Sequence, residues 1–354
     1  MTGKDRPQMF FDGHNDVLLR LLSHAEPERD FLSGDGEGQL DLPRMKAGGF
    51  AGGLFAIYIP SDLEPPAEDP MLQPEYDIPL PPPIPAKDAA PLATRMAATL
   101  LRIEQASKGG VRICRSAGDI RAAMKDNVLA AVMHMEGAEA IDADFAMLDM
   151  LYAAGLRSLG PVWSRPNIFG HGVPFRFPSS PDTGPGLTEK GRELVRICNN
   201  RRVAIDLSHL NEQGFWDVAA VSDAPLIASH SNAHTICASS RNLTDRQLHA
   251  IRERRGIVGV NFAVAFLRPD GQHKPDTALD IMLRHIDHLI QHAGIDSVGF
   301  GSDFDGATVP KDITDAAGLP NLADAMRKHG YDDETMRKLC FDNWINVLER
   351  TWGS

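Results

Sequence analysis

The chain has 354 residues, of which 43% are apolar and 24% are charged, and its formal net charge is −12. This composition is typical of a soluble globular protein, and the excess of acidic side chains argues against nucleic acid or an anionic membrane surface as a partner. No apolar run approaches the ~20 residues of a membrane-spanning helix, and the opening MTGKDRPQMF lacks the apolar core of a signal peptide, so we expect a cytoplasmic protein.

Eight short apolar runs recur along the chain, and most are followed by a segment with helical spacing. The runs lie at 9–13, 53–59, 128–135, 156–162, 203–207, 226–229, 257–261 and 298–301. Continuous rather than alternating runs predict strands buried on both faces, as in a parallel sheet. Helices are predicted at 90–107, 142–154, 188–202, 212–221, 244–255, 277–293 and 332–351.

This alternation predicts one α/β domain over residues 1–354, a (β/α)8 TIM barrel with long loops at its C-terminal face. A doubly wound sheet is the alternative, but no GxGxxG motif follows an early strand. Two segments interrupt the alternation, a proline-rich insertion at 60–91 and a Gly/Pro-rich loop at 163–186. Both follow predicted strands, so we expect them to cover an active site rather than to decorate the surface.

Two strand ends carry the first candidate metal ligands. In the motif FDGHND, His14 and Asp16 project to the same face, because side chains alternate along an extended backbone. Glu136 ends the third run and is followed by glycine, and glutamate is rarely buried without a partner. His134 competes with Glu136 as a ligand, but it is expected one layer deeper in the barrel or as a core histidine.

The later strand ends add nitrogen and oxygen donors. His209 and His230 end two consecutive runs, and such donor sets suit zinc or a related ion. Asp206 is either a supporting partner of a ligand or an ordinary strand-end acid. Asp303, in the motif GSDFDG, is placed to transfer protons beside an activated water. Five donors exceed the needs of one ion, so Glu136 bridging two ions is the economical arrangement.

These motifs resemble the membrane (renal) dipeptidase family of the amidohydrolase superfamily. The resemblance rests on DGHND, MEG, DLSH, SHSNAHTICASSRN and GSDFDG, in this order between residues 12 and 305. It implies a (β/α)8 barrel that hydrolyses dipeptides at two Zn²⁺ ions per chain, often with a D-residue at the C-terminal position. Homodimers are common in that family, so the resemblance also leaves a homodimer open.

The resemblance also implies a role for each site residue. It places His14 and Asp16 on one metal and Glu136 between the two. His209 and His230 then hold the other metal, and Asp303 is the catalytic acid and base. Arg241, in SSRN, would hold the α-carboxylate of the substrate, and a guanidinium suits this role because it pairs with a carboxylate through two hydrogen bonds.

One family feature is absent from this sequence. Relatives carry a histidine after the fourth strand that polarises the scissile carbonyl, whereas this chain has Trp163 there. Arg165 or His171 is a candidate replacement as a substrate-binding, oxyanion-stabilising group. The loss of one such donor typically lowers the rate ~100–1000-fold. Relatives also often have a tyrosine at the position of Ala263, after Asn-Phe. This difference weakens the inference that this chain acts on the same substrate as its relatives.

The leading hypothesis is therefore a metallo-dipeptidase in which a hydroxide bridging two metals attacks the peptide carbonyl. One alternative is a related amidohydrolase that acts on another small amide, such as an N-acyl amino acid. A second alternative is a non-catalytic barrel that serves as a binding module. His285, His288 and His292 recur at i, i+3 and i+7 and resemble a metal-binding face, but with no acid expected opposite them they predict a solvated side of a helix.

Overall fold

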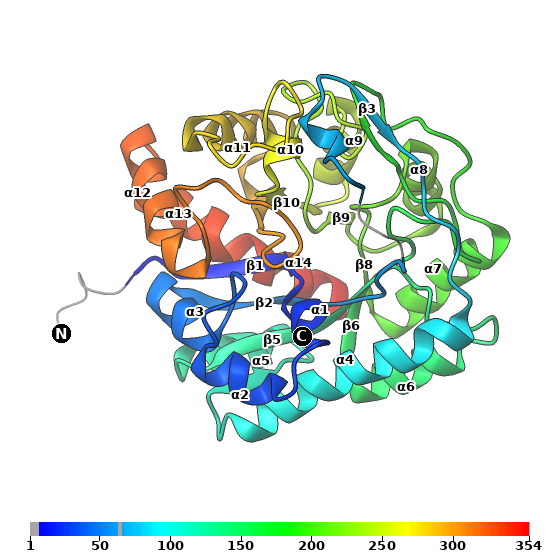
Figure 1. Cartoon of the computed structure of the whole chain (residues 1–354), viewed down its shortest axis with the longest axis horizontal. Helices are drawn as coiled ribbons and strands as arrows, with labels where there is room; N and C mark the ends of the chain where they lie inside the picture. Colours follow the sequence, from blue (N-terminus) through cyan, green and yellow to red (C-terminus); the bar gives the residue numbers. More distant parts are fainter. Residues whose placement is uncertain (1–6, 63–65, 354) are drawn as a thin grey trace.

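The computed structural model describes residues 7–62 and 66–353, and a ring of parallel strands forms its centre (Figure 1). The strands are β1 (Phe10–Asn15), β2 (Phe50–Tyr58), β5 (Leu129–Glu136), β6 (Leu156–Gly160), β8 (Ala204–Ile205), β9 (Ile227–Ala228), β10 (Ile257–Asn261) and β11 (Val298–Gly301). They pair in the order β8-β6-β5-β2-β1-β11-β10-β9. A parallel bridge between Asp206 and Ile227 joins the two ends of this order. The predicted (β/α)8 barrel is confirmed.

Helices surround the strands (Figure 1). They are α4 (Ala86–Ala106), α5 (Ala117–Lys125), α6 (Ala146–Ala154), α7 (Glu189–Arg201), α8 (Glu212–Val221), α9 (Asp245–Glu253), α11 (Leu279–Ala293) and α12 (Leu319–His329). The Thr188 side chain accepts from the Gly191 amide at the start of α7, and Thr244 forms a capping box with Gln247 at the start of α9. Neither α5 nor α12 was predicted from the sequence, and α4 begins four residues before its predicted start because Pro91 is accommodated inside the helix.

Several smaller elements complete the barrel. The connection from β1 to β2 contains α1 (Val17–Leu21), α2 (Pro27–Ser33) and α3 (Leu42–Gly48), and β4 (Val111–Ile113) pairs with β5. Single turns lie at η1 (Pro70–Leu72), η2 (Ile295–Ser297) and η3 (Ala316–Gly318). The predicted C-terminal helix is instead α13 (Asp333–Arg337), a π-helical turn η4 (Lys338–Asp342) and α14 (Asn343–Trp352). Its buried Trp344 donates a hydrogen bond to the carbonyl oxygen of Phe300 in β11.

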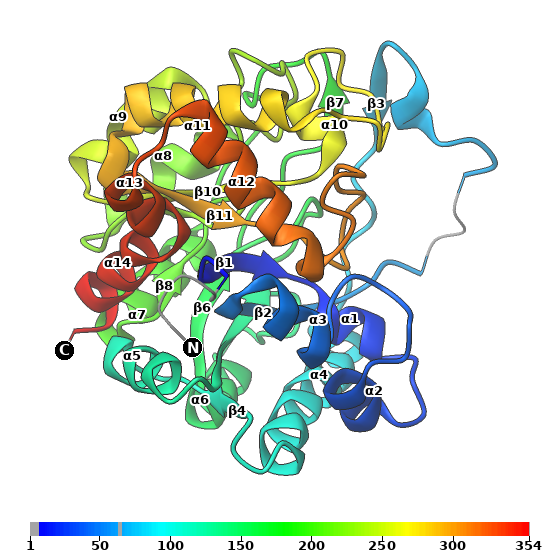
Figure 2. The same cartoon turned by 90° about the vertical axis from the view of Figure 1, so that its left-hand side faces the viewer.

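The two long loops meet each other at the rim of the barrel. In the first, β3 (Tyr76–Ile78) pairs antiparallel with β7 (Phe175–Phe177) of the second, and Figure 2 shows both strands near α10 (Val264–Leu267). The rings of Tyr76 and Phe177 stack with centroids 6.0 Å apart. The Tyr76 hydroxyl donates to the carbonyl oxygen of Gly271. These contacts hold the loops together as a small cover beside the strand ends.

No helix in the described residues combines the length and the apolar character needed to cross a membrane.

Candidate metal centre

The carboxylate of Glu136 is the meeting point of three imidazoles. Its Oε1 lies 2.9 Å from Nε2 of His209, 3.3 Å from Nε2 of His230 and 3.5 Å from Nε2 of His14. Glu136 is the last residue of β5, His14 lies in β1, and the other two follow β8 and β9. The C-terminal ends of barrel strands share one rim, so residues far apart in sequence converge there. These four predicted ligands are together in the structure.

Hydrogen bonds on the opposite ring nitrogens orient two of these imidazoles. Nδ1 of His209 lies 2.9 Å from the hydroxyl of Ser164, and Nδ1 of His230 lies 2.8 Å from the hydroxyl of Ser229. A hydrogen bond of this kind fixes the ring and leaves the other nitrogen for a metal. Both histidines were predicted as site residues from the sequence but neither serine was, although Ser229 begins the motif SHSNAHTICASSRN and Ser164 follows Trp163.

A second group of donors lies beside the first. Oδ2 of Asp16 is 3.3 Å from Nε2 of His14, and the two residues form a potential ion-binding group with Asp303. Asp16 can occupy this position only because residue 306 is a glycine, since a Cβ atom there would lie 2.0 Å from Oδ2 of Asp16. The buried cluster thus splits into two groups of donors, and Glu136 lies within 3.5 Å of a histidine in each group.

Asp303 is held in a left-handed backbone conformation, with φ of 61°. Its amide donates to the carbonyl oxygen of His14 at 3.0 Å, and the side-chain amide of Asn261 donates to its Oδ2 at 2.9 Å. Non-glycine residues in this region are often found at functional sites, where surrounding contacts enforce them. Asn261 was not predicted as a site residue; its position at the end of an apolar run was the available signal.

The electrostatics of the cluster favour a bound cation. Burial raises the pKa of Glu136 well above its usual value, and the nearby carboxylates of Asp16 and Asp303 add to this effect. Burial alone would lower the pKa of His14, but Glu136 and Asp16 together raise it well above its usual value. The buried carboxyl groups of Glu136, Asp16 and Asp303 thus lie around His14, whose imidazole binds a proton. Buried charges are normally paired or bound to metals, so a cation would stabilise this group of acids.

Two further observations support the same conclusion. Burial, with Arg241 and His14 as neighbouring cations, lowers the pKa of His209 and His230 well below the usual value, so both imidazoles are neutral. Neutral imidazole is the form that binds metals. In the described part of the chain, the buried Oδ1 of Asp16 has no hydrogen-bond partner. A cation bound by Asp16 would satisfy this oxygen, so the residues fit a metal site.

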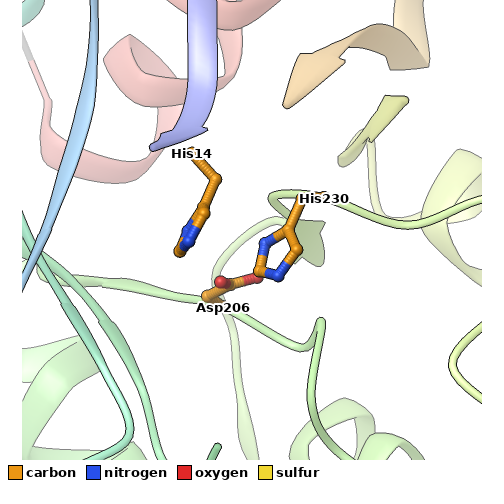
Figure 3. A group of neighbouring side chains, drawn as sticks. All are labelled: His14, Asp206 and His230. Carbon is orange, nitrogen blue, oxygen red and sulfur yellow. The ribbon is translucent and has the colours of Figure 1, made fainter. Parts of the chain in front are cut away.

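Asp206 supports the loops that carry the ligands. Figure 3 shows it beside His14 and His230, and the three residues could also hold an ion. However, its carboxylate already accepts hydrogen bonds from the amides and hydroxyls of both Ser208 and Ser229. These bonds fix the turns after β8 and β9. Of the two roles left open for Asp206, the structure favours that of supporting partner.

His134 lies below the cluster, in the core of the barrel. It is fully buried, and its Nδ1 is 2.9 Å from the hydroxyl of Ser158. Burial lowers its pKa to about 4, which keeps the ring neutral. The preference for Glu136 over His134 as the ligand therefore agrees with the geometry.

A cavity of about 270 Å³ opens directly above the cluster. Its floor is polar and its walls are largely apolar. The floor includes Asp16, Glu136, His209, Arg241 and Asp303. The walls include Tyr58, Met71, Trp163, Phe175, Ala263 and Phe266. Met71 comes from the first long loop and Trp163 and Phe175 from the second, so both loops contribute to the cavity.

Arg241 brings a positive charge to this cavity. Its side chain is buried, and it donates hydrogen bonds to the carbonyl oxygens of Ser208 and His230. Burial lowers its pKa to about 10, which still leaves it charged at neutral pH. Its guanidinium carbon lies 5.5 Å from the ring centre of Phe266. The charge is thus fixed in position between the metal ligands and the apolar wall.

Neither Arg165 nor His171 lines the cavity, so the structure does not support either residue as the replacement for the histidine that polarises the scissile carbonyl in relatives. Arg165 is fully buried outside the cavity lining, where it pairs with Glu139 at 3.2 Å and donates to the carbonyl oxygen of Ile59. His171 also lies outside the lining, with Nδ1 3.3 Å from the carbonyl oxygen of Gly186. Trp163 does line the cavity and packs against Tyr58, with ring centroids 5.1 Å apart.

A (β/α)8 barrel with imidazoles and carboxylates gathered at one rim defines the class of metal-dependent hydrolases. Comparison with known proteins narrows the class. The model of the membrane dipeptidase family (peptidase family M19) matches residues 6–352. The chain therefore belongs to this family, and it is a metal-dependent dipeptidase, a hydrolase of peptide bonds.

Similar proteins agree with this assignment. A metallopeptidase from Rhodobacter sphaeroides was crystallised with a phosphinate mimic of the dipeptide L-Ala-D-Ala, and its sequence is 58% identical to this chain. The two structures superpose with a TM-score of 0.96, and the alignment covers 98% of this chain and 100% of the relative. Dipeptidase AC, another metallopeptidase of family M19, is also 58% identical with a TM-score of 0.96, covering 99% of this chain and 100% of its own. An uncharacterized protein from the pqqA 5' region of Klebsiella pneumoniae is 51% identical over 246 residues, which are 70% of this chain and 91% of that protein.

Proposed function

We propose that this chain hydrolyses small dipeptides with a D-residue at the C-terminal position, at a centre of two Zn²⁺ ions. The observation that carries this proposal is the position of Glu136, whose Oε1 lies within 3.5 Å of three imidazole nitrogens. A carboxylate at the centre of two donor groups is suited to bridge two ions. His14 and Asp16 would hold one ion, and His209 and His230 would hold the other.

Zinc at such a site supplies a water of lowered pKa and polarises the carbonyl that is attacked. Asp303 would accept a proton from the attacking water and deliver it to the nitrogen of the breaking peptide bond, so a dipeptide yields two free amino acids. Burial raises the pKa of Asp303, which brings its carboxyl closer to the range where it exchanges protons at neutral pH. Asn261 holds Oδ2 of Asp303 and leaves Oδ1 free for this transfer.

Arg241 binds the α-carboxylate of the C-terminal residue. Its charge faces the cavity beside the metal ligands, so a carboxylate bound there places the neighbouring peptide bond over Glu136 and Asp303. The aromatic wall of Trp163, Tyr58 and Phe175 excludes water from this bond. A carboxylate bound by Arg241 selects the peptide bond next to the C-terminal residue, and the limited size of the cavity excludes longer peptides.

The size of the cavity restricts the substrate. Its volume of about 270 Å³ lies below the range of roughly 300–1,000 Å³ that is usual for drug-sized ligands. Small side chains therefore fit best. The D-configuration is proposed because the Rhodobacter sphaeroides relative, 58% identical to this chain, was crystallised with a mimic of L-Ala-D-Ala.

A substrate panel with enzyme of defined zinc content tests the proposal. We expect turnover of L-Ala-D-Ala and slower or no turnover of the tripeptide L-Ala-D-Ala-D-Ala and of N-acetyl-D-Ala. Faster hydrolysis of N-acetyl-D-Ala than of L-Ala-D-Ala would favour the alternative function, an amidohydrolase that acts on N-acyl amino acids. Zinc bound with no turnover of any dipeptide would contradict the proposal and favour a binding module. Metal analysis is expected to give two zinc ions per chain at the rim, and chelation is expected to abolish activity.

A further inference from the structure

A second group of imidazole and carboxylate side chains lies on the outside of the barrel, between α9 and α11. The two helices pack against each other (Figures 1 and 2). Each contributes two donor residues one helical turn apart, Asp245 and His249 on α9 and His288 and His292 on α11. Side chains four residues apart lie on the same face of a helix. The pairs face each other, so the prediction of a solvated helix side with no acid opposite was wrong.

The donor atoms converge on one point. Nε2 of His288 lies 2.7 Å from Oδ1 of Asp245, and Nε2 of His292 lies 3.8 Å from its Oδ2. The rings of His288 and His292 stack with centroids 4.3 Å apart and planes inclined by 26°. Both Nε2 atoms thus face the same carboxylate, and the three donor atoms lie within 4.8 Å of one another.

These separations are close to those of a metal site. A separation of 3.8 Å is too long for a hydrogen bond. Two ligands held at ~2.0–2.1 Å from one tetrahedral ion are roughly 3.3 Å apart. Small rotations of the side chains of His288 and His292 therefore suffice to bring all three atoms around one ion.

His249 prepares one of the imidazoles for this role. Its Nε2 lies 3.4 Å from Nδ1 of His292, with ring centroids 5.3 Å apart. When Nδ1 of His292 donates to His249, the lone pair of His292 is on Nε2, which faces Asp245. Metal-binding histidines usually have such a partner on the second nitrogen, and its loss weakens metal binding ~10–100-fold. His249 is therefore a positioning residue.

The cluster is accessible and suitably charged. The side chains of His288, His292 and Asp245 are 15%, 19% and 38% exposed, so an ion reaches them from solvent without unfolding. Asp245 presents its carboxylate to both imidazoles, and a carboxylate binds a metal in its ionised form.

We propose that Asp245, His288 and His292 bind one divalent transition-metal ion, such as Zn²⁺, Cu²⁺ or Ni²⁺, at a site separate from the catalytic rim. Two imidazoles select this class over Mg²⁺ and Ca²⁺, which prefer oxygen ligands. Three protein ligands leave the remaining positions to water, and the ion connects α9 to α11. The site is independent of the proposed catalytic function.

Metal content after dialysis against controlled free Zn²⁺ tests this proposal. His292→Ala and His288→Gln are each expected to bind one ion per chain fewer than the wild type. This difference does not depend on how many ions the rim holds. The matched control is His329→Ala, because His329 is also partly exposed and pairs with a single acid, Asp287, at 2.8 Å, but has no second histidine in its pair. The control is expected to retain the full complement.

Two further measurements separate a metal site from a surface ion pair. Electron paramagnetic resonance of added Cu²⁺ is expected to show two imidazole nitrogens in the wild type and fewer in His292→Ala. His249→Ala is expected to keep the stoichiometry and to weaken Zn²⁺ binding about tenfold by calorimetry. Dipeptidase activity is expected to be unchanged in all these variants, and melting temperatures in chelator check that they are folded. Equal zinc content in the wild type and His292→Ala, or an equal loss in His329→Ala, would overturn the proposal.

Discussion

The rim cluster around Glu136 and the helix cluster around Asp245 contain the same types of donor but are held in different ways. At the rim, the side chains of His14, His209 and His230 are at most 6% exposed and come from three strand ends. Between α9 and α11, the donors come from two helices and are partly exposed. The rim crowds several acids together, whereas the helix cluster has one acid already hydrogen bonded to an imidazole.

This difference indicates how strongly each cluster depends on a cation. Without one, buried like charges at the rim repel each other, and Oδ1 of Asp16 has no partner within the described residues. The Asp245–His288 pair is satisfied as it stands. Loss of a metal should therefore abolish chemistry at the rim but remove only a cross-link between the helices. The following predictions test this contrast.

The largest effect is expected from Glu136→Gln. The amide keeps the shape of the side chain but loses the charge that faces all three imidazoles, so metal content at the rim and dipeptidase activity should both be lost. Elemental analysis and a dipeptide assay measure this. Glu139→Gln is a suitable control, because Glu139 is equally buried but pairs with Arg165 instead. Retention of full metal content in Glu136→Gln would contradict its central position.

Asp303→Asn should separate chemistry from metal binding. A general acid or base typically contributes about 10²–10⁴-fold to the rate, so kcat should fall by that factor while metal content stays close to that of the wild type. Steady-state kinetics on metal-loaded protein give the answer. A fall of less than tenfold would show that Asp303 does not carry the proton.

Arg241→Met should act on substrate binding. Removing one charge-assisted contact of about 1.5–3 kcal/mol is expected to raise KM about tenfold to 150-fold, with a smaller change in kcat. The same substitution should have no such effect on a substrate that lacks a free carboxylate. An unchanged KM for L-Ala-D-Ala would show that another group binds the carboxylate.

His285 is expected to affect stability rather than activity. It lies on α11 but is fully buried; its Nδ1 accepts from the Ala233 amide, and its Nε2 donates to the carbonyl oxygen of Leu267. Burial lowers its pKa to about 4. The unfolded chain therefore binds a proton below pH ~6.5 that the folded chain does not, and stability falls as the pH falls from 6.5 towards 4.

The expected size of this loss is about 3 kcal/mol over that range, from ~1.36 kcal/mol per pKa unit. Chemical denaturation of the wild type and His285→Gln at several pH values measures it. The variant should be less stable at pH 7 and should show a shallower decline in acid. Parallel declines in the two proteins would contradict the assignment to His285.

The smallest effect is expected from Ser164→Ala. Its hydroxyl contacts the second nitrogen of His209, so its removal should weaken rim metal binding about tenfold and leave the fold intact. The matching change at the helix cluster is His249→Ala. Similar losses of metal affinity in the two variants would show that the hydrogen-bond partner of a metal-binding histidine matters equally at a buried and at an exposed site. A loss of affinity only in Ser164→Ala would show that burial is required.

The sequence predicted the strand ends and the chemistry they carry. Continuous apolar runs located all eight barrel strands, and the polar residues that end them include Glu136, His209 and His230. This succeeds because strand periodicity and the shared rim of a barrel are local or topological rules. The helices α5 and α12 were not predicted although their apolar residues recur with helical spacing, and the start of α4 was misplaced because of its internal Pro91.

The sequence did not predict what each candidate side chain contacts. Arg165 was expected at the substrate but pairs with Glu139, and Asn261 proved to be the partner of Asp303. The first outcome depends on loops that meet only in the folded chain, and the second depends on the pairing of β10 with β11.

Residue order along the chain therefore determined the barrel, its catalytic rim and the donors on it, because these follow from hydrophobic period and strand polarity. Only the tertiary structure decided that His285 is buried while His288 and His292 meet Asp245. The reason is physical: the three histidines share one helix, but their partners come from segments distant in the sequence. Ala233 and Leu267 contact His285, whereas α9 supplies Asp245 to the other two histidines.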